Sequence, residues 1–99
     1  MRQRLVDLLI ERASDLDLVF ITGDVGFRLL EPLRDALGER FINAGVAEQN
    51  MIGVAAGMSA KGLETWVYSI APFIYARPSE QVRNDLAFHG LPVQLVGHG

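Results

Sequence analysis

The sequence contains no cysteine, which excludes disulfide bonds, thiolate catalysis and cysteine-based zinc sites. It contains only two histidines, His89 and His98, so a histidine-rich metal site is not expected and no metal ligands are assigned. No apolar run approaches the roughly 18 residues of a membrane-spanning helix, and the amino terminus lacks the apolar core of a signal peptide. These absences predict a cytoplasmic protein that does not enter a membrane.

The charge and length of the chain limit its partners and its architecture. The formal net charge is −3, so overall electrostatics do not favour nucleic acid or an anionic membrane. At 99 residues the chain is one domain or part of one. Hydrophobic residues make up 49% of the sequence, which is slightly high for so short a soluble chain and indicates buried strands.

Helical and strand-like patterns alternate along the chain. Helices are expected over residues 3–14, 31–37, 46–61 and 71–88, and strands over residues 18–21, 41–42, 65–70 and 93–96. This alternation predicts an α/β fold of three layers, with a mainly parallel sheet covered by helices on both faces. The last strand is followed directly by a glycine-rich loop. We therefore expect residues 1–99 to be a single, partial domain of a longer protein.

Glu48 stands near the start of the helix expected over residues 46–61. The helix macrodipole favours an acid in the first turn by roughly 0.3–1 kcal/mol, which would explain this residue without any function. However, its neighbours Val46, Met51 and Ile52 are apolar and leave little solvated surface. A carboxyl group in such a place could share a proton with a bound base. Both interpretations remain open from the residues alone.

The other candidate residues follow expected strands, where the ligand crevice of a parallel sheet lies. Asp24 and Val25 belong to a glycine-bearing loop, and glycines after a strand more often form a simple turn than a ligand-binding loop. Phe73 could be a core aromatic or a ligand-stacking residue. His98 ends the last strand in a glycine context, where it could be functional or merely exposed.

Residues 41–51, Phe-Ile-Asn-Ala-Gly-Val-Ala-Glu-Gln-Asn-Met, closely resemble the pyrimidine-binding domain of the transketolase family of thiamine-diphosphate enzymes. The resemblance continues over residues 52–58, 69–73, 81–85 and 95–98. The motif Ala-Glu-Gln-Asn-Met is most similar to transketolase-like proteins that are split into two subunits. The pyruvate dehydrogenase β subunit and deoxyxylulose-phosphate synthase share the glutamate with different flanking residues. The resemblance implies the thiamine-diphosphate-binding fold.

The resemblance implies a catalytic role for Glu48. In this family a glutamate hydrogen-bonds N1′ of the cofactor's pyrimidine and favours the imino form of the 4′-amino group. That group then takes the C2 proton of the thiazolium. Thiamine diphosphate supplies the electron sink, and the protein supplies placement and proton management.

The resemblance also implies roles for five further residues. Asp24 and Val25 match an acid–aliphatic pair in the first strand-end loop, whose aliphatic member supports the bent cofactor. Val46 would line the same pocket, and Phe73 would stack on the pyrimidine ring. His98 matches a histidine that contacts the sugar-phosphate substrate in some members.

The family holds the cofactor's diphosphate and Mg²⁺ on a separate domain, through a Gly-Asp-Gly motif followed by an asparagine, and this sequence contains no such motif. The expected partners are therefore a separate diphosphate-binding subunit, further copies of this chain, or both, together with a sugar-phosphate substrate. The expected function is transfer of a two-carbon ketol unit between sugar phosphates, with the isolated chain inactive.

Two alternatives stay open at this point. One is a non-catalytic α/β module that self-associates through a smooth helix face formed by Gly53, Gly57 and Ala60. The other is an enzyme of the 2-oxo acid dehydrogenase β type or the deoxyxylulose-phosphate synthase type, which uses the same cofactor on a different substrate.

Overall fold

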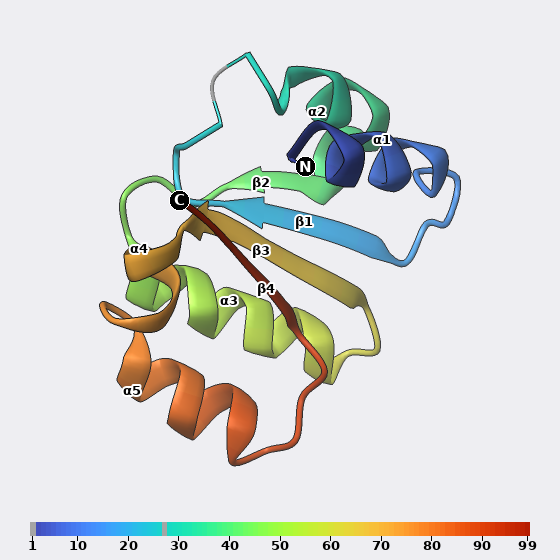
Figure 1. Ribbon diagram of the computed structural model, residues 1–99. Helices are drawn as coiled ribbons and strands as arrows, with labels where there is room; N and C mark the ends of the chain where they lie inside the picture. The colour runs from blue at the N-terminus through green and yellow to red at the C-terminus, as the bar shows by residue number, and fades with distance from the viewer. Residues whose placement is uncertain (1, 27) are drawn as a thin grey trace.

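Helices and strands alternate in the computed structural model, which describes residues 2–26 and 28–99 (Figure 1). The strands are β1 (Leu18–Thr22), β2 (Phe41–Asn43), β3 (Glu64–Ile70) and β4 (Gln94–His98). The α-helices are α1 (Arg2–Glu11), α2 (Glu31–Leu37), α3 (Glu48–Ala60), α4 (Ala71–Tyr75) and α5 (Ser79–Gln81). A 3-10 turn, η1 (Gly38–Arg40), precedes β2, and a π-helical segment, η2 (Val82–Ala87), follows α5. The predicted α/β fold class is confirmed.

The four strands form one sheet in the order β2-β1-β3-β4, and every neighbouring pair is parallel. In the central strand, Phe20 lies opposite Phe41 on one side and Trp66 on the other. Because all strands run the same way, their carboxyl ends meet at one edge of the sheet, at the left in Figure 1. The loops at this edge carry the candidate residues.

Helices cover both faces of the sheet (Figure 1). On one face, Leu18 and Phe20 of β1 pack in a core cluster with α1 and α2. On the other face, Val19 and Ile21 pack in a second cluster with α3 and η2. All of β1 is buried, which explains why its sequence is a continuous apolar run rather than an alternating one.

The helix expected over residues 71–88 is interrupted. Helix α4 ends at Tyr75, residues 76–78 form a turn, and α5 and η2 follow. Pro78 explains the break, because proline disfavours the helical conformation in the residue before it. Arg77 therefore lies in a turn between two short helices instead of on a helix face.

Other boundaries shift by a few residues. The helix expected over residues 46–61 begins at Glu48, so Val46 and Ala47 precede it, and Ala47 takes the N-cap position with φ −146° and ψ 64°. The first helix ends at Glu11, short of the expected residue 14. Strand β4 begins at Gln94 and includes His98 as its last residue. None of the helices in the described part of the chain is long and apolar enough to cross a membrane.

The smooth face of α3 does not pack closely within the described chain. A Cβ atom added at Gly53 or Gly57 would meet no heavy atom of the described residues within 4 Å outside its immediate surroundings in the helix. A hollow of about 580 Å³ lies along this face, between α3 on one side and η2 with the residues that follow it on the other. Gly97 is the opposite case, because a Cβ there would come within 2.8 Å of Ala71 Cα. Close contact between β4 and α4 thus requires glycine at position 97.

Candidate functional site

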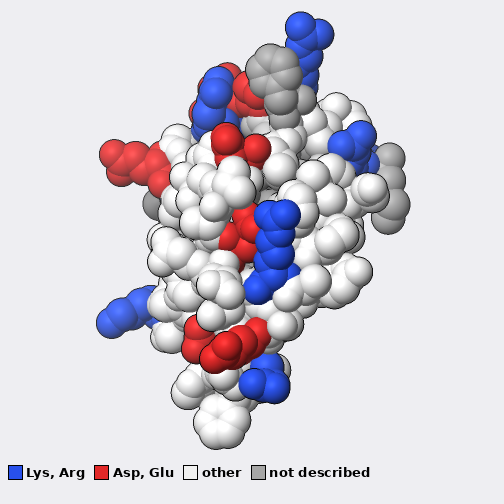
Figure 2. All heavy atoms as spheres, turned by 90° about the vertical axis from the view of Figure 1, so that its left-hand side faces the viewer, with Lys and Arg blue, Asp and Glu red and all other residues white. Residues whose placement is uncertain are grey.

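At the edge of the sheet where the strands end, hydrogen bonds link the segments that follow β1 and β2. Asn43 Nδ2 donates to Asp24 Oδ1 at 3.0 Å, and Asn43 Oδ1 accepts from the Gly45 amide at 2.9 Å. Asp24 has a φ of 60°, in the left-handed region that Asp and Asn tolerate better than most residues. Figure 2 looks onto this edge and shows acidic and basic side chains meeting near its middle.

Glu48 is the first residue of α3, and its side chain is only 6% exposed. Its Oε1 accepts a hydrogen bond from Arg77 Nη1 at 2.9 Å, which also makes an ion pair. The two residues lie on a hollow of about 480 Å³ whose lining comes from the start of α3 and the turn before α5. The expectation of a desolvated acid at this helix start is confirmed.

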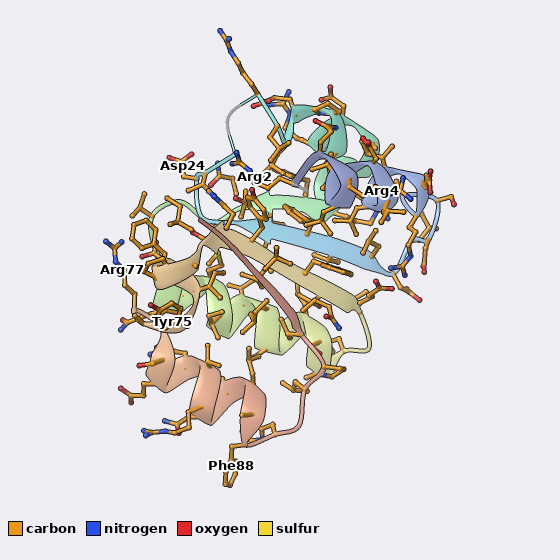
Figure 3. The ribbon with its side chains drawn as sticks, in the orientation of Figure 1. Arg2, Arg4, Asp24, Tyr75, Arg77 and Phe88 are labelled. Atoms are coloured by element: carbon orange, nitrogen blue, oxygen red, sulfur yellow. The ribbon has the colours of Figure 1, made fainter. Side chains whose placement is uncertain are left out.

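Arg77 connects Glu48 to Phe73. Its guanidinium carbon lies 3.8 Å from the centroid of the Phe73 ring, while Nη1 reaches Glu48. The Arg77 carbonyl accepts from Gln49 Nε2 at 3.4 Å, which ties the turn to α3. Figure 3 shows Arg77 and Tyr75 at the same edge of the sheet as Asp24.

Sequence reasoning missed Arg77. The one available signal was the Arg77–Pro78 dipeptide, which marks a probable break in the expected helix. That signal places Arg77 in a turn, but it does not reveal a contact with a residue 29 positions earlier in the chain.

Two of the predicted residues, Glu48 and Val46, line this hollow, and a third, Phe73, lies next to it through its contact with Arg77. Val46 stands at its rim with 73% of its surface exposed, because it precedes the helix instead of belonging to it. Phe73 is partly buried beneath the Arg77 guanidinium. Glu48, Val46 and Phe73 thus combine a buried acid, an apolar rim and an aromatic face, which is a set that suits a flat, nitrogen-bearing ligand.

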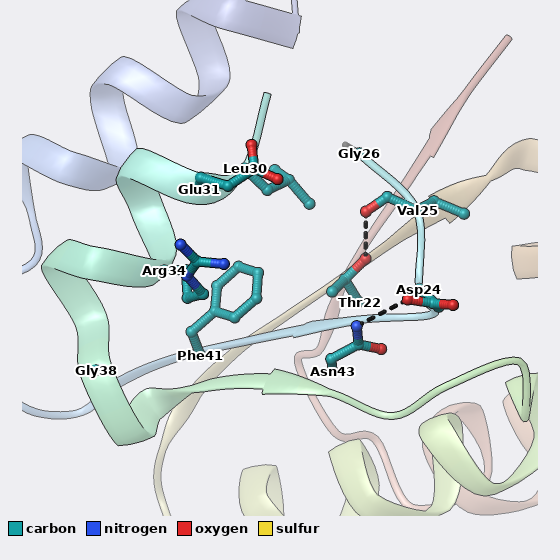
Figure 4. A pocket seen from close by; sticks show the side chains of 10 residues that line it. All are labelled: Thr22, Asp24, Val25, Gly26, Leu30, Glu31, Arg34, Gly38, Phe41 and Asn43. Atoms are coloured by element: carbon teal, nitrogen blue, oxygen red, sulfur yellow. Dashed lines mark hydrogen bonds between the residues drawn. The ribbon is translucent and has the colours of Figure 1, made fainter. Parts of the chain in front are cut away.

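Asp24 and Val25 line a second hollow of about 450 Å³, between the loop after β1 and helix α2 (Figure 4). The Thr22 hydroxyl donates to the Val25 carbonyl at 3.4 Å and stabilises the loop. Glu48 does not line this hollow. Asp24 and Val25 therefore lie at the predicted edge of the sheet, where the strands end. They line a different hollow from the one beside Glu48.

His98 lies on the other side of the sheet from α3. Its ring stacks on Tyr68 with centroids 5.1 Å apart, and Tyr68 belongs to the core cluster beneath α1. Burial, with a smaller contribution from the positive charge of Arg2, lowers the pKa of His98. His98 Nε2 and Tyr68 Oη are buried and have no hydrogen-bond partner among the described residues. The structure does not bring His98 into the hollow beside Glu48.

Within residues 2–26 and 28–99, no group of three or more histidine, aspartate or glutamate side chains is arranged to hold a metal ion. The two carboxylates of the edge, Asp24 and Glu48, instead accept hydrogen bonds from neighbouring nitrogen donors.

Comparison with known proteins identifies the family of the chain. Residues 11–99 match the family described as the transketolase pyrimidine-binding domain. The chain belongs to this family. The predicted resemblance is therefore confirmed over most of the chain.

Several relatives of this transketolase domain are subunits of split enzymes. The chain is 36% identical over 98 residues to a subunit of the apulose-4-phosphate transketolase of Phocaeicola vulgatus, with 97% of the chain and 31% of the relative covered. It is 37% identical over 99 residues to the 6-deoxy-6-sulfo-D-fructose transketolase subunit SqwH of a Clostridium species, with 98% and 31% covered.

A solved structure shows the same domain fold. It is described as a split gene transketolase, inactive beta4 tetramer, and it superposes with a TM-score of 0.82 and 30% identity. The alignment covers 96% of this chain and 33% of that chain. The chain thus spans about a third of the length of these relatives.

Proposed function

We propose that this transketolase pyrimidine-binding domain forms the pyrimidine-binding part of an enzyme that transfers a two-carbon ketol unit between sugar phosphates, using thiamine diphosphate. One observation carries the proposal. The carboxyl group of Glu48 is buried at the start of α3, and its neighbour Arg77 is stacked on the ring of Phe73. A buried acid beside an aromatic face is what recognition of an aminopyrimidine requires.

The residues present fit the pyrimidine end of the cofactor. The Arg77 guanidinium is a flat group with N–H donors, and it both covers Phe73 and donates to Glu48. The space between these residues therefore accepts a flat, nitrogen-bearing group. An aminopyrimidine offers the same two features, a planar face for stacking and ring nitrogen for a hydrogen bond.

Thiamine diphosphate, when bound, supplies the reactive carbon and the electron sink. Glu48 would share a proton with N1′ of the pyrimidine, because a carboxyl group withdrawn from water interacts strongly with a nearby base. Phe73 would orient the ring by stacking, and Val46 would shield the rim from water. Val25, with Asp24 beside it, would support the cofactor from the loop after β1. His98 would contact the sugar phosphate.

We further propose that the 99-residue chain is inactive by itself and works with a second subunit that holds the diphosphate and Mg²⁺. Two relatives are named as subunits of transketolases, and the similar solved structure is described as an inactive tetramer of one subunit type. The open face of α3 is available for assembly with further copies of the chain.

Transfer assays with and without a diphosphate-binding subunit test this function. The assembled protein, given thiamine diphosphate and Mg²⁺, is expected to move a ketol unit from a ketose phosphate to an aldose phosphate, and the chain alone is expected to show no turnover. Pyruvate offered as the donor should not react. Turnover by the chain alone, or reaction with pyruvate but not with ketose phosphates, would contradict the proposal.

A further inference from the structure

We infer that Arg77 occupies the position of the pyrimidine in the free domain and must be displaced before the cofactor binds, so that this residue regulates cofactor binding. The inference rests on the proposed function, since it names Glu48 and Phe73 as the residues that hold the pyrimidine. It adds a residue and a role that follow only from the contacts in the structure.

The contacts of Arg77 are those expected of the ligand. Its guanidinium lies over the Phe73 ring, with the guanidinium carbon 3.8 Å from the ring centroid. At the same time Nη1 donates to Glu48 Oε1 at 2.9 Å. Arginine is suited to this imitation, because its planar group can stack on an aromatic face and form directed hydrogen bonds together.

The guanidinium and a pyrimidine ring cannot share this place. Two flat groups at stacking distance exclude each other from one face of Phe73, and both would need the exposed side of a carboxyl group that is only 6% accessible. Binding of the cofactor therefore requires Arg77 to turn away. The free domain gains from the contact, because a buried carboxylate without a partner is costly.

The surroundings of the Arg77 side chain allow it to move. The side chain is 52% exposed, so the guanidinium can turn into water without crossing packed side chains, although Glu48 then loses its partner. The other hydrogen bonds of Arg77 are both long and both made by the backbone: Gln49 Nε2 donates to the Arg77 carbonyl at 3.4 Å, and the Arg77 amide donates to the Pro72 carbonyl at 3.4 Å. The neighbouring Pro78 is fully buried and anchors the turn, so the Arg77 side chain can swing while the backbone stays in place.

A competing side chain lowers the apparent affinity for the cofactor by the fraction of molecules in which the site is closed. Removing it should therefore strengthen binding by about three- to tenfold, which corresponds to a site that is closed in roughly two-thirds to nine-tenths of the free molecules. The variant Arg77→Ala removes both the ion pair and the stacking contact. Arg77→Lys keeps the charge but loses the planar fork, so an intermediate gain is expected. Arg83→Ala is the matched control, since Arg83 is an exposed arginine on η2.

The experiment is calorimetric titration of thiamine diphosphate with Mg²⁺ into the assembled protein, for wild type and these variants, with the turnover of Glu48→Gln measured in parallel. Tighter binding by Arg77→Ala or Arg77→Lys, with Arg83→Ala unchanged, supports the inference. Unchanged or weaker binding by both Arg77 variants overturns it, and loss of turnover in Glu48→Gln would then leave the proposed function standing. If Arg77→Ala does not fold, Arg77→Lys decides alone. Absence of cofactor binding in every protein overturns both claims.

Discussion

The buried carboxylate of Glu48 is stabilised by two different parts of the structure. Its position in the first turn of α3 places the carboxylate near the positive end of the helix dipole, and Arg77 neutralises it from the turn before α5. The contact with Arg77 is important because Glu48 is buried, and a charge that is removed from water is costly unless a partner in the protein compensates it.

A double-mutant cycle measures that dependence. Arg77→Met should lower the free energy of unfolding by about 1–2 kcal/mol, because it leaves a buried carboxylate without its partner. Adding Glu48→Gln should recover part of the loss, since the unpaired charge is then gone. Chemical denaturation of the four proteins gives the coupling, and strictly additive effects would show that the two residues do not interact.

His98 should make stability depend on pH. Burial, followed by the charge of Arg2, lowers its pKa from 6.5, so the unfolded chain takes up a proton before the folded one does. The free energy of unfolding should therefore fall as the pH drops below 6.5.

Denaturant titrations between about pH 7.5 and about pH 5.5 would show this decrease. His98→Asn should flatten it, whereas His89→Asn should keep it, because His89 is exposed. An equal slope in wild type and His98→Asn would contradict the assignment.

At the scale of elements, the sequence predicts the alternating order well because period and composition are local properties. The runs 18–21 and 65–70 both form strands, and the helix expected to end at residue 61 ends at Ala60. The segment 71–88 was harder, since its apolar spacing is helical throughout while Pro78 breaks the helix. The spacing of apolar residues does not show that Pro78 lacks a backbone N–H and clashes with the preceding turn, and these two effects end the helix.

Two substitutions of the same kind should have opposite effects on stability. Gly97→Ala would place a methyl group 2.8 Å from Ala71 Cα, which is backbone and cannot yield, so a loss of about 1–3 kcal/mol is expected. Gly53→Ala adds a methyl group to an open face of α3 and should stabilise the helix by about 1 kcal/mol. Thermal unfolding of both variants checks the pair. A stabilised Gly97→Ala would show that β4 and α4 do not approach so closely.

At the scale of the whole molecule, the parallel topology places Asp24, Glu48 and Phe73 at one edge of the sheet, as expected for residues that follow parallel strands. The sequence does not predict that these residues, together with His98, are distributed over separate surroundings at that edge. Strand pleating directs the ring of His98 to the α1 face, where it meets Tyr68, and α2 gives Asp24 a hollow of its own. The role of Arg77 depends on a contact between distant segments, which no local pattern records.

The central claim is that Glu48 manages a proton on the pyrimidine of thiamine diphosphate. The most direct test is the turnover of Glu48→Gln in the assembled enzyme, with Glu80→Gln, an exposed acid in the first turn of α5, as the control. We predict a loss of about 100-fold or more for Glu48→Gln with the fold retained, and near-normal turnover for Glu80→Gln. Near-normal turnover of a folded Glu48→Gln enzyme would contradict the account.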